Sequence, residues 1–268
     1  MALLIGSGIT FWGGVSMTPG DPIPSWATQK AIFGYGYTST WSNSTNLVSN
    51  TGVVSTDTTG VGTARDGLAA AGYGSDKAIF GYGRTFSYVN VSVTNLVSNT
   101  GVVATDTTGV GTARSFLAAA RYSTDKAIFG YGSTGSIVSM SNLVSNTGVV
   151  ATDTTGVGTA RSALAASGYG LDKAIFGYGY NGTTMQNVTN LVSNTGVVAT
   201  DTTGVGTARS QLAASGYGTD KGIFGYGSSS GTYYSITNLI SNTGVVATDT
   251  TGIGTARDEL AAAGYSTT

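Results

Sequence analysis

One seven-residue string recurs at nearly constant intervals along this chain of 268 residues. KAIFGYG begins at four lysines and returns as KGIFGYG at a fifth, in steps of 47, 49, 47 and 48 residues: Lys30, Lys77, Lys126, Lys173 and Lys221. A second string, DTTGVGTAR or DTTGIGTAR, keeps the same count and ends at Arg65, Arg114, Arg161, Arg209 and Arg257. Two independent markers in one register predict five structural units of a single kind.

Each unit divides into four short segments separated by Gly, Asn and Asp: LAAAGYG, KAIFGYG, TNLVSN and TGVVATDTTGVGTAR. None has the length or the 3.6-residue period of a helix, and all have the composition of short strands. Four strands in a unit of 40 to 50 residues are typical of a propeller blade, whereas most helical repeats are shorter. The sequence therefore predicts an all-β fold, a five-bladed β-propeller of four-stranded antiparallel blades.

The two ends of the repeat array are complementary. The first unit begins at its second strand, Lys30 to Gly36, and lacks LAAAGYG; the last unit continues past Arg257 into a spare copy, Leu260 to Tyr265. Pairing of this C-terminal strand beside Lys30 to Gly36 would leave no sheet edge open. We expect residues 29–268 to form the closed propeller and residues 1–28 to be a separate, non-repeating segment.

Two resemblances follow from these strings. IFGYG before a variable loop, with Arg preceding LAAAGYG, resembles the kelch-like propeller repeat, although the paired Trp and Tyr late in the kelch blade are missing. The whole unit, with NLVSNTGVVATDTTGVGTAR, is similar over residues 30 to 265 to repeats in structural proteins of tailed bacteriophages, especially phages of cyanobacteria and other aquatic hosts. That second resemblance implies a virion protein of the tail, baseplate, fibre or capsid exterior, made in the host cytoplasm.

Differences among the five copies are concentrated in two connections. The segment between the second and third strands is rewritten in every unit, and the two residues after each repeated Arg also vary, whereas SNTG between the third and fourth strands is constant. Because strands alternate in direction, both variable connections fall on one face of the disc and the constant ones on the other.

The variable face should carry several large side chains amid Ser, Thr, Asn and Gly: Tyr37, Trp41, Phe86, Tyr88, Met185, Tyr233 and Tyr234. In such a surface, aromatic residues supply contact area and small polar residues supply hydrogen bonds. We interpret it as a ligand-binding face, with a host-surface glycan as the expected ligand. The alternative is that these loops differ only because exposed loops drift.

The composition argues against several other functions. With 12 Lys and Arg against 13 Asp and Glu, the chain has no basic stripe to attract nucleic acid. It has no His and no Cys, and its one Glu, Glu259, lies in a turn. The usual general base and metal ligand are thus missing, and no nucleophile has a partnering base. We expect a non-enzymatic protein without cofactor or bound metal.

The repeated charged and aromatic residues fit a scaffold better than a site. Each Asp of DTTG, such as Asp106, should cap its own turn and could pair with the arginine of the same strand; a ring of calcium sites is the alternative. The aromatic residues of IFGYG should fill the gaps between neighbouring units, in preference to forming a sugar-stacking platform.

The first 28 residues hold Phe11, Trp12, Trp26 and all three prolines. Glycines interrupt their apolar run and no Lys or Arg precedes Lys30, which disfavours a signal peptide and a membrane span. We expect this segment to dock on another virion protein through Phe11 and Trp12, or to drive self-association; the alternative is that it covers an opening of the central channel. Two further functional hypotheses remain: a spacer or cement protein that contacts only virion subunits, and a free lectin or kelch-type adaptor.

Overall fold

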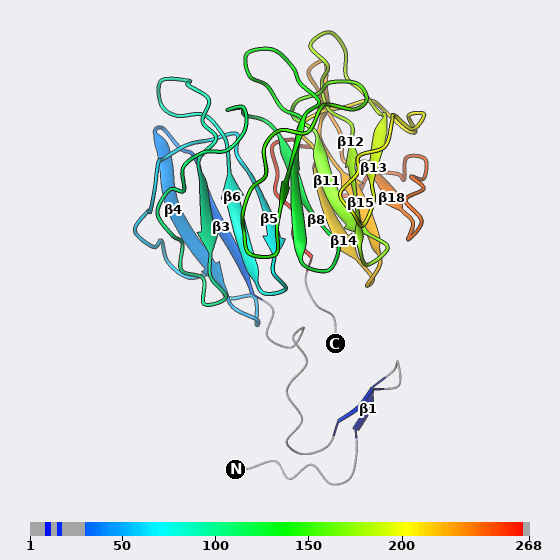
Figure 1. Ribbon diagram of the computed structural model, residues 1–268. Helices are drawn as coiled ribbons and strands as arrows, with labels where there is room; N and C mark the ends of the chain where they lie inside the picture. The colour runs from blue at the N-terminus through cyan, green and yellow to red at the C-terminus, as the bar shows by residue number, and fades with distance from the viewer. Residues whose placement is uncertain (1–8, 12–14, 18–29, 265–268) are drawn as a thin grey trace.

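The computed structural model describes residues 9–11, 15–17 and 30–264, and within these ranges every regular element is a β-strand (Figure 1). The first unit contains β3 (Ala31–Tyr37) and β4 (Trp41–Val48). The second contains β5 (Ala69–Tyr73), β6 (Lys77–Gly81) and β7 (Thr94–Val97), and the third β8 (Ala118–Tyr122), β9 (Lys126–Gly130) and β10 (Ser141–Val144). The fourth contains β11 (Ala165–Tyr169), β12 (Lys173–Gly177) and β13 (Thr189–Val192), and the fifth β14 (Ala213–Tyr217), β15 (Lys221–Gly225) and β18 (Thr237–Ile240), with β16 (Ser228–Ser229) and β17 (Thr232–Tyr233) forming a small hairpin in its loop.

The second to fifth units are three-stranded antiparallel sheets rather than the four-stranded blades that the sequence predicts. The fourth segment of each unit follows the third strand but meets it only at isolated bridges, in the second unit Val103 with Val97 and Thr107 with Thr94. Beyond the second bridge the segment bonds to the next unit, through Thr112 to Asp153 and Arg114 to Asn142. The prediction of strand character and of five units is thus confirmed, while that of four regular strands per unit is wrong.

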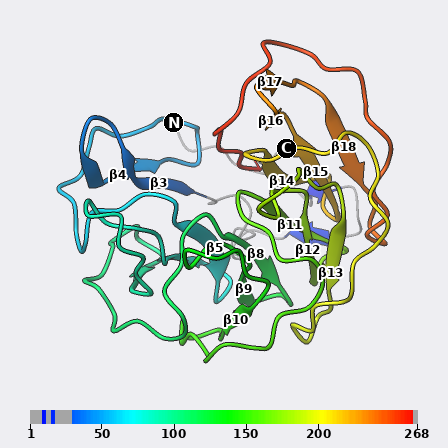
Figure 2. The same cartoon turned by 90° about the horizontal axis from the view of Figure 1, so that it is seen from above.

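The units are arranged around a common axis with their first strands innermost (Figure 2). Backbone hydrogen bonds join the turns that lead into these inner strands: Phe116 N–H donates to Gly67 O at 2.7 Å, and Ala163 N–H donates to Phe116 O at 2.8 Å. Gln211 N–H continues the series to Ala163 O, and Glu259 N–H to Gln211 O at 3.0 Å. One contact repeated between successive units sets the curvature of the whole array.

The sheets do not close into a ring, which corrects the predicted pairing of the C-terminal strand. Leu260 to Gly264 form no strand, and among the described residues β3 is paired with β4 alone. Gly264 instead lies near β14, where a Cβ added to it would be 3.1 Å from Gly216 O. The pairing is missing because the fifth and first units do not make the contacts that join the other neighbouring units.

The other neighbouring units are joined by contacts between aromatic rings, which we call the aromatic interlock. The tyrosine of each GYG packs edge-on or tilted against the phenylalanine of the next unit, at ring-centroid distances of 5.1 or 5.2 Å: Tyr35 with Phe80, Tyr82 with Phe129, Tyr131 with Phe176 and Tyr178 with Phe224. The glycine before each tyrosine is needed for this approach, since a Cβ at Gly81 would lie 2.7 Å from the Phe129 ring. The predicted role of the IFGYG aromatics in packing between units is confirmed.

The two ends of the sheets differ in their connections (Figure 1). At the lower end, tight turns contact their neighbours: Gly74 N–H donates to Asp125 O at 2.7 Å. The longer, rewritten loops lie at the upper end. Because Ala31 pairs with Val48, which precedes the SNTG turn, β3 begins at the lower end, so residues 1–29 join the repeats on the side opposite to the rewritten loops.

Only part of the N-terminal segment can be described. β1 (Ile9–Phe11) and β2 (Val15–Met17) pair in antiparallel register, Phe11 opposite Val15. Phe11 is thus placed in a strand, whereas Trp12 and Trp26 lie outside the described residues. The predicted docking role of Phe11 and Trp12 stays a prediction.

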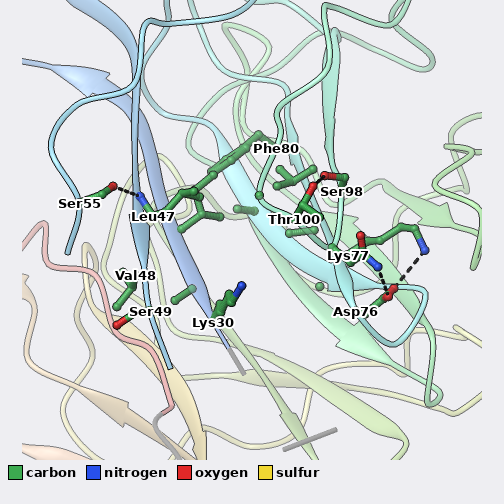
Figure 3. A pocket seen from close by; sticks show the side chains of 18 of the residues that line it. Lys30, Leu47, Val48, Ser49, Ser55, Asp76, Lys77, Phe80, Ser98 and Thr100 are labelled. Carbon is green, nitrogen blue, oxygen red and sulfur yellow. Dashed lines mark hydrogen bonds and ion pairs between the residues drawn. The ribbon is translucent and has the colours of Figure 1, made fainter. Parts of the chain in front are cut away.

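A cavity of about 950 Å³ lies between parts of the first and second units (Figure 3). Its walls come from β3 and β4 on one side and from β5, β6 and the turn after β7 on the other, and they include Leu47, Phe80 and Gly101. It lies beside the one unit that has no inner strand.

Candidate binding surface

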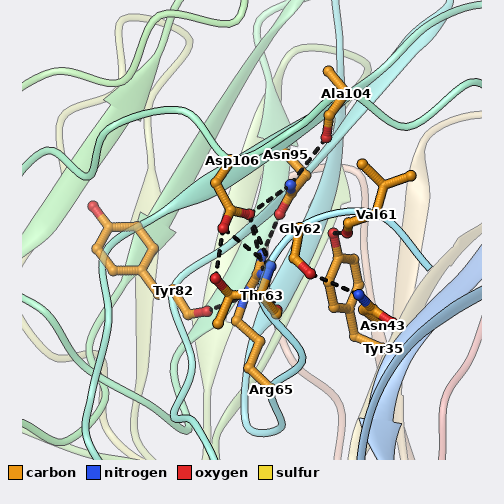
Figure 4. A network of polar contacts seen from close by, with 10 residues as sticks. All are labelled: Tyr35, Asn43, Val61, Gly62, Thr63, Arg65, Tyr82, Asn95, Ala104 and Asp106. Carbon is orange, nitrogen blue, oxygen red and sulfur yellow. Dashed lines mark hydrogen bonds and ion pairs between the residues drawn. The ribbon is translucent and has the colours of Figure 1, made fainter.

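The repeated arginines Arg65, Arg114, Arg161 and Arg209 and the aspartates that face them are used within the scaffold, in a polar node at each of four junctions between units (Figure 4). Arg65, fully buried at the end of the first unit, donates to Tyr82 O at 2.7 Å and to Asn95 Oδ1 at 2.6 Å in the second unit. Its guanidinium also lies 4.3 Å from the centroid of the Tyr35 ring, within cation–π range. The same arrangement recurs at Arg114 and Arg209, while Arg161 keeps the asparagine contact, with Asn190 Oδ1 at 2.5 Å.

The aspartate of DTTG belongs to this node and faces the preceding unit. Asp106 accepts from Thr63 N–H at 3.0 Å and from Thr63 Oγ1 at 2.6 Å, and lies 4.0 Å from Arg65 Nη1. Asn95 Nδ2 holds the other oxygen of Asp106 at 2.9 Å. The prediction that this aspartate caps its own turn or pairs with the arginine of its own strand is therefore wrong: its partners are Thr63 and Arg65 of the unit before.

The node changes the protonation of its members. Burial alone would raise the pKa of Asp106, but hydrogen bonds from Thr63 and Asn95 and the charge of Arg65 hold it below its usual value. Burial raises the pKa of Tyr82 to about 12, because the charge of Arg114 offsets only part of the desolvation. These groups stay in one charge state at neutral pH. Among the residues that the structure describes, no three acidic side chains lie close enough to hold a metal ion.

Against this scaffold, one group of rewritten side chains stands out. Trp41 lies at the centre of an aromatic cluster, with its ring centroid 4.9 Å from Tyr37, 5.2 Å from Phe86 and 5.4 Å from Tyr88, all in edge-to-face geometry. Tyr37 and Trp41 come from the first unit, and Phe86 and Tyr88 from the second. Loops rewritten separately in two neighbouring units thus build one surface, the aromatic cluster of Tyr37, Trp41, Phe86 and Tyr88.

An ion pair lies beside the aromatic cluster. Asp66 accepts from Arg84 Nε at 2.8 Å and from Arg84 Nη2 at 3.1 Å, and also from Trp41 Nε1 at 3.2 Å. The Arg84 guanidinium lies 5.1 Å from the Tyr88 ring centroid and 4.6 Å from that of Phe116. The hydrogen bond from Arg84 to Asp66 raises the pKa of the guanidinium further, so Arg84 is positively charged at all ordinary pH values. The pair fixes the Trp41 indole and holds charged hydrogen-bonding groups next to aromatic rings.

The aromatic cluster is accessible to a ligand. Phe86 is 72% exposed, Tyr88 67% and Tyr37 58%, while Trp41 is half-buried beneath them. Isolated exposed aromatic residues are common, but several in mutual contact form a patch, and such patches mark interaction sites.

The other predicted surface residues are not part of this cluster. Met185 bridges to Tyr180 within the loop of the fourth unit and is half-buried. Tyr233 lies in β17 of the fifth unit, 56% exposed, and the adjacent Tyr234 is half-buried. Sequence reasoning missed Arg84, Asp66 and Phe116. A signal for Arg84 existed, because it is the one charged residue in the rewritten segments between second and third strands.

Comparisons with known proteins add no identification. No protein-family model matches the chain, and no curated protein is similar to it in sequence. The resemblances to kelch-like and phage repeats therefore rest on the strings quoted above. The described part of the chain contains no helix long and apolar enough to cross a membrane.

Proposed function

We propose that this chain is a non-enzymatic virion protein of a tailed bacteriophage that displays the aromatic cluster of its first two units for attachment to a host-surface glycan. In this proposal the five units act as the blades of a five-bladed propeller. The observation that carries it is the convergence of Tyr37, Trp41, Phe86 and Tyr88 on a scaffold whose buried arginines are already paired with aspartates.

The chemistry of the aromatic cluster suits a sugar ring. The apolar C–H face of a pyranose stacks on an aromatic face, whose partial negative charge attracts the C–H groups. Sugar hydroxyls both donate and accept, and the Asp66–Arg84 pair offers an acceptor and a donor within a few ångströms of the rings. Because that pair is internally neutralised, it favours a neutral sugar over a strongly anionic one.

The position of Lys30, where the N-terminal segment joins the repeats, supports display. Residues 1–29 join the repeats at Lys30, at the end of the sheets opposite to the rewritten loops. A segment that docks on another virion protein from this side would leave the aromatic cluster pointing away from the particle. The phage assignment itself rests on the repeat strings.

The test is a glycan array probed with the full chain, followed by affinity measurement on any sugar retained. We expect Trp41→Ala to weaken binding at least about tenfold, because central aromatic anchors dominate binding energy. The matched control is Tyr233→Ala, an exposed tyrosine of the fifth unit outside the cluster, which should leave the affinity unchanged. Equal loss in both variants, or binding that survives Trp41→Ala, would refute the assignment of the site.

A second candidate, the spacer or cement protein, is favoured by one observation. The first valine of each TGVV is 65% or 66% exposed in all five units: Val53, Val102, Val149, Val197 and Val245. An apolar side chain repeated at the constant turns is suited to contacts with other protein subunits. If the array retains no glycan while the chain binds isolated virions, this alternative replaces glycan attachment.

A further inference from the structure

The ion pair beside the aromatic cluster uses only part of Arg84. Its Nε and Nη2 donate to Asp66 at 2.8 and 3.1 Å, whereas none of the described residues accepts a hydrogen bond from Nη1. The Arg84 side chain is 27% exposed, and the only buried side-chain nitrogens without a partner in the described part of the chain belong to Arg161. Nη1 of Arg84 is therefore a charged donor that is open to solvent.

Two aromatic rings lie against this guanidinium. Its central carbon is 5.1 Å from the Tyr88 ring centroid and 4.6 Å from that of Phe116. Tyr88 is 67% exposed and Phe116 38%. Phe116 is not one of the four cluster residues and lies in the turn before β8, so the aromatic surface extends from the cluster past Arg84. An atom bound at Nη1 would have apolar ring surface beside it.

This combination occurs at one place among the five units. Arg84 directly follows GYG in the second unit, and Phe116 is the second residue after the repeated Arg of the same unit. The corresponding residues of the other units pair no arginine with an aromatic ring. After GYG they are Tyr37, Ser133, Tyr180 and Ser228, and after the repeated Arg they are Gly67, Ala163, Gln211 and Glu259.

The chemistry of Arg84 and its rings selects a particular ligand group. A charged N–H donor binds an acceptor oxygen strongly. A second negative charge is disfavoured, because Asp66 already balances Arg84 and the ring faces carry partial negative charge. A cation is disfavoured because Arg84 repels it. The best match is a neutral group that joins an acceptor oxygen to an apolar carbon, as the acetamido group of an N-acetylated amino sugar does.

We propose that Arg84 is the specificity-determining residue of the aromatic cluster and that it selects N-acetylated amino sugars. Nη1 of Arg84 donates to the acetamido oxygen, the acetamido methyl group packs on the Phe116 ring, and the pyranose lies on the aromatic cluster. The inference rests on the proposed glycan attachment and adds to it the class of sugar and the residue that chooses it.

The test compares free sugars that differ in one substituent, titrated against the full chain and followed by NMR. The probes are N-acetylglucosamine and N-acetylgalactosamine, their parent hexoses glucose and galactose, and the charged relatives glucosamine and glucuronic acid. We expect at least one N-acetylated sugar to bind at least about tenfold more tightly than its parent hexose, since it gains a hydrogen bond to a charged donor. Glucosamine and glucuronic acid should bind no better than glucose.

Two variants assign the preference to its residues. Arg84→Met removes the donor and should bring the affinities of the N-acetylated sugar and its parent hexose within about threefold of each other. Phe116→Ala should weaken the N-acetylated sugar about fourfold, because it loses contact for one methyl group, and leave the parent hexose unchanged. The backbone accepts this change, since Ala163 occupies the corresponding position with φ of 50°, against 54° at Phe116.

The matched control is Arg121→Gly, which removes an exposed arginine elsewhere. Arg121 lies in β8 and pairs with Ala127 near the lower end of the sheets, and glycine stands at the corresponding positions of three other units: Gly72, Gly168 and Gly216. Arg121→Gly should leave every sugar affinity unchanged. Equal loss of preference in Arg121→Gly and Arg84→Met would show an effect of net charge and overturn the role of Arg84.

The remaining outcomes separate this inference from glycan attachment itself. A parent hexose that binds as tightly as its N-acetylated form, or a preference that survives Arg84→Met, would overturn the inference. If neither N-acetylated sugar binds while the array retains another glycan through Trp41, the sugar class is wrong and glycan attachment stands. If the array retains no glycan and no free sugar binds, both are refuted.

Discussion

An arginine, an aspartate and a tyrosine come together in two kinds of place in this molecule, the buried polar node and the exposed aromatic cluster. In the polar node around Arg114, a fully buried guanidinium stacks on Tyr82 at 4.3 Å and lies 3.8 Å from Asp153. In the aromatic cluster, Arg84 stacks near Tyr88 and pairs with Asp66 at 2.8 Å, at the surface. The node repeats along the chain, whereas the surface assembly occurs once.

The difference teaches what burial does to an arginine, an aspartate and a tyrosine. In the node, the arginine and the aspartate bond to residues of the neighbouring unit, so the loss of one leaves others without partners in a desolvated site. At the surface, water can replace any lost partner, so the same substitution costs little stability. Stability should therefore depend on the node, and binding on the surface cluster.

The largest contrast is expected for the two arginines. Arg114→Met removes bonds to Tyr131 O and Asn142 Oδ1 in a fully buried site, and should lower the free energy of unfolding by about 3–5 kcal/mol. Arg84→Met should lower it by about 1 kcal/mol or less. Urea unfolding of the two variants against the parent chain measures both. Similar losses would show that the surface pair is as structural as the node.

A smaller contrast is expected for the two aspartates. Burial would raise the pKa of Asp153, but bonds from Thr112 and Asn142 and the charge of Arg114 hold it below its usual value. A lowered carboxyl pKa contributes stability that is present above the pKa of the unfolded chain, about 4, and is lost as pH falls through the folded value. Stability should thus fall as the pH is lowered from about 5 toward 2.

Asp153→Asn should cost about 1–2 kcal/mol at pH 7 and should flatten this acid dependence, because one of the responsible carboxyls is gone. Asp66→Asn should cost less than about 1 kcal/mol at pH 7. Unfolding free energies measured from pH 7 to pH 3 provide the comparison. An unchanged slope in Asp153→Asn would contradict the role assigned to the node.

The sequence was sufficient to predict the units but not the partners within the node. Repetition predicted five units, their strand character and the packing of the IFGYG aromatic residues between units, because periodic aromatic residues in a sheet protein need a periodic neighbour. It could not assign Asp106, which has an identical arginine after it in its own unit, Arg114, and one before it, Arg65. Only the three-dimensional arrangement decides between two chemically equivalent partners.

The sequence was sufficient to predict which face carries the candidate site, but not the contacts among its aromatic residues. Alternating strand direction places Trp41 and Phe86 at the same end of the sheets, and the structure has them there. Whether two loops of neighbouring units touch depends on loop conformation, such as the positive φ of 57° at Tyr88, which no repeat pattern specifies. For the same reason Arg84 and Asp66, 18 positions apart on two different connections, were not recognised as a pair.

The smallest contrast is expected for the two tyrosines that stack on these arginines. Tyr82 donates its hydroxyl to Val110 O at 3.1 Å, so Tyr82→Phe should cost about 0.5–1.5 kcal/mol, whereas Tyr88→Phe at the exposed cluster should stay within about 0.5 kcal/mol of the parent.

Burial raises the pKa of Tyr82 to about 12. A raised pKa means stability that is fully present below the unfolded value, about 10, and is lost as pH rises toward 12. Tyr82→Phe should therefore weaken the alkaline loss of stability and remove one late-titrating group from the tyrosinate absorbance of the folded chain. An unchanged number of late-titrating tyrosines in Tyr82→Phe would contradict the burial of Tyr82 in the node.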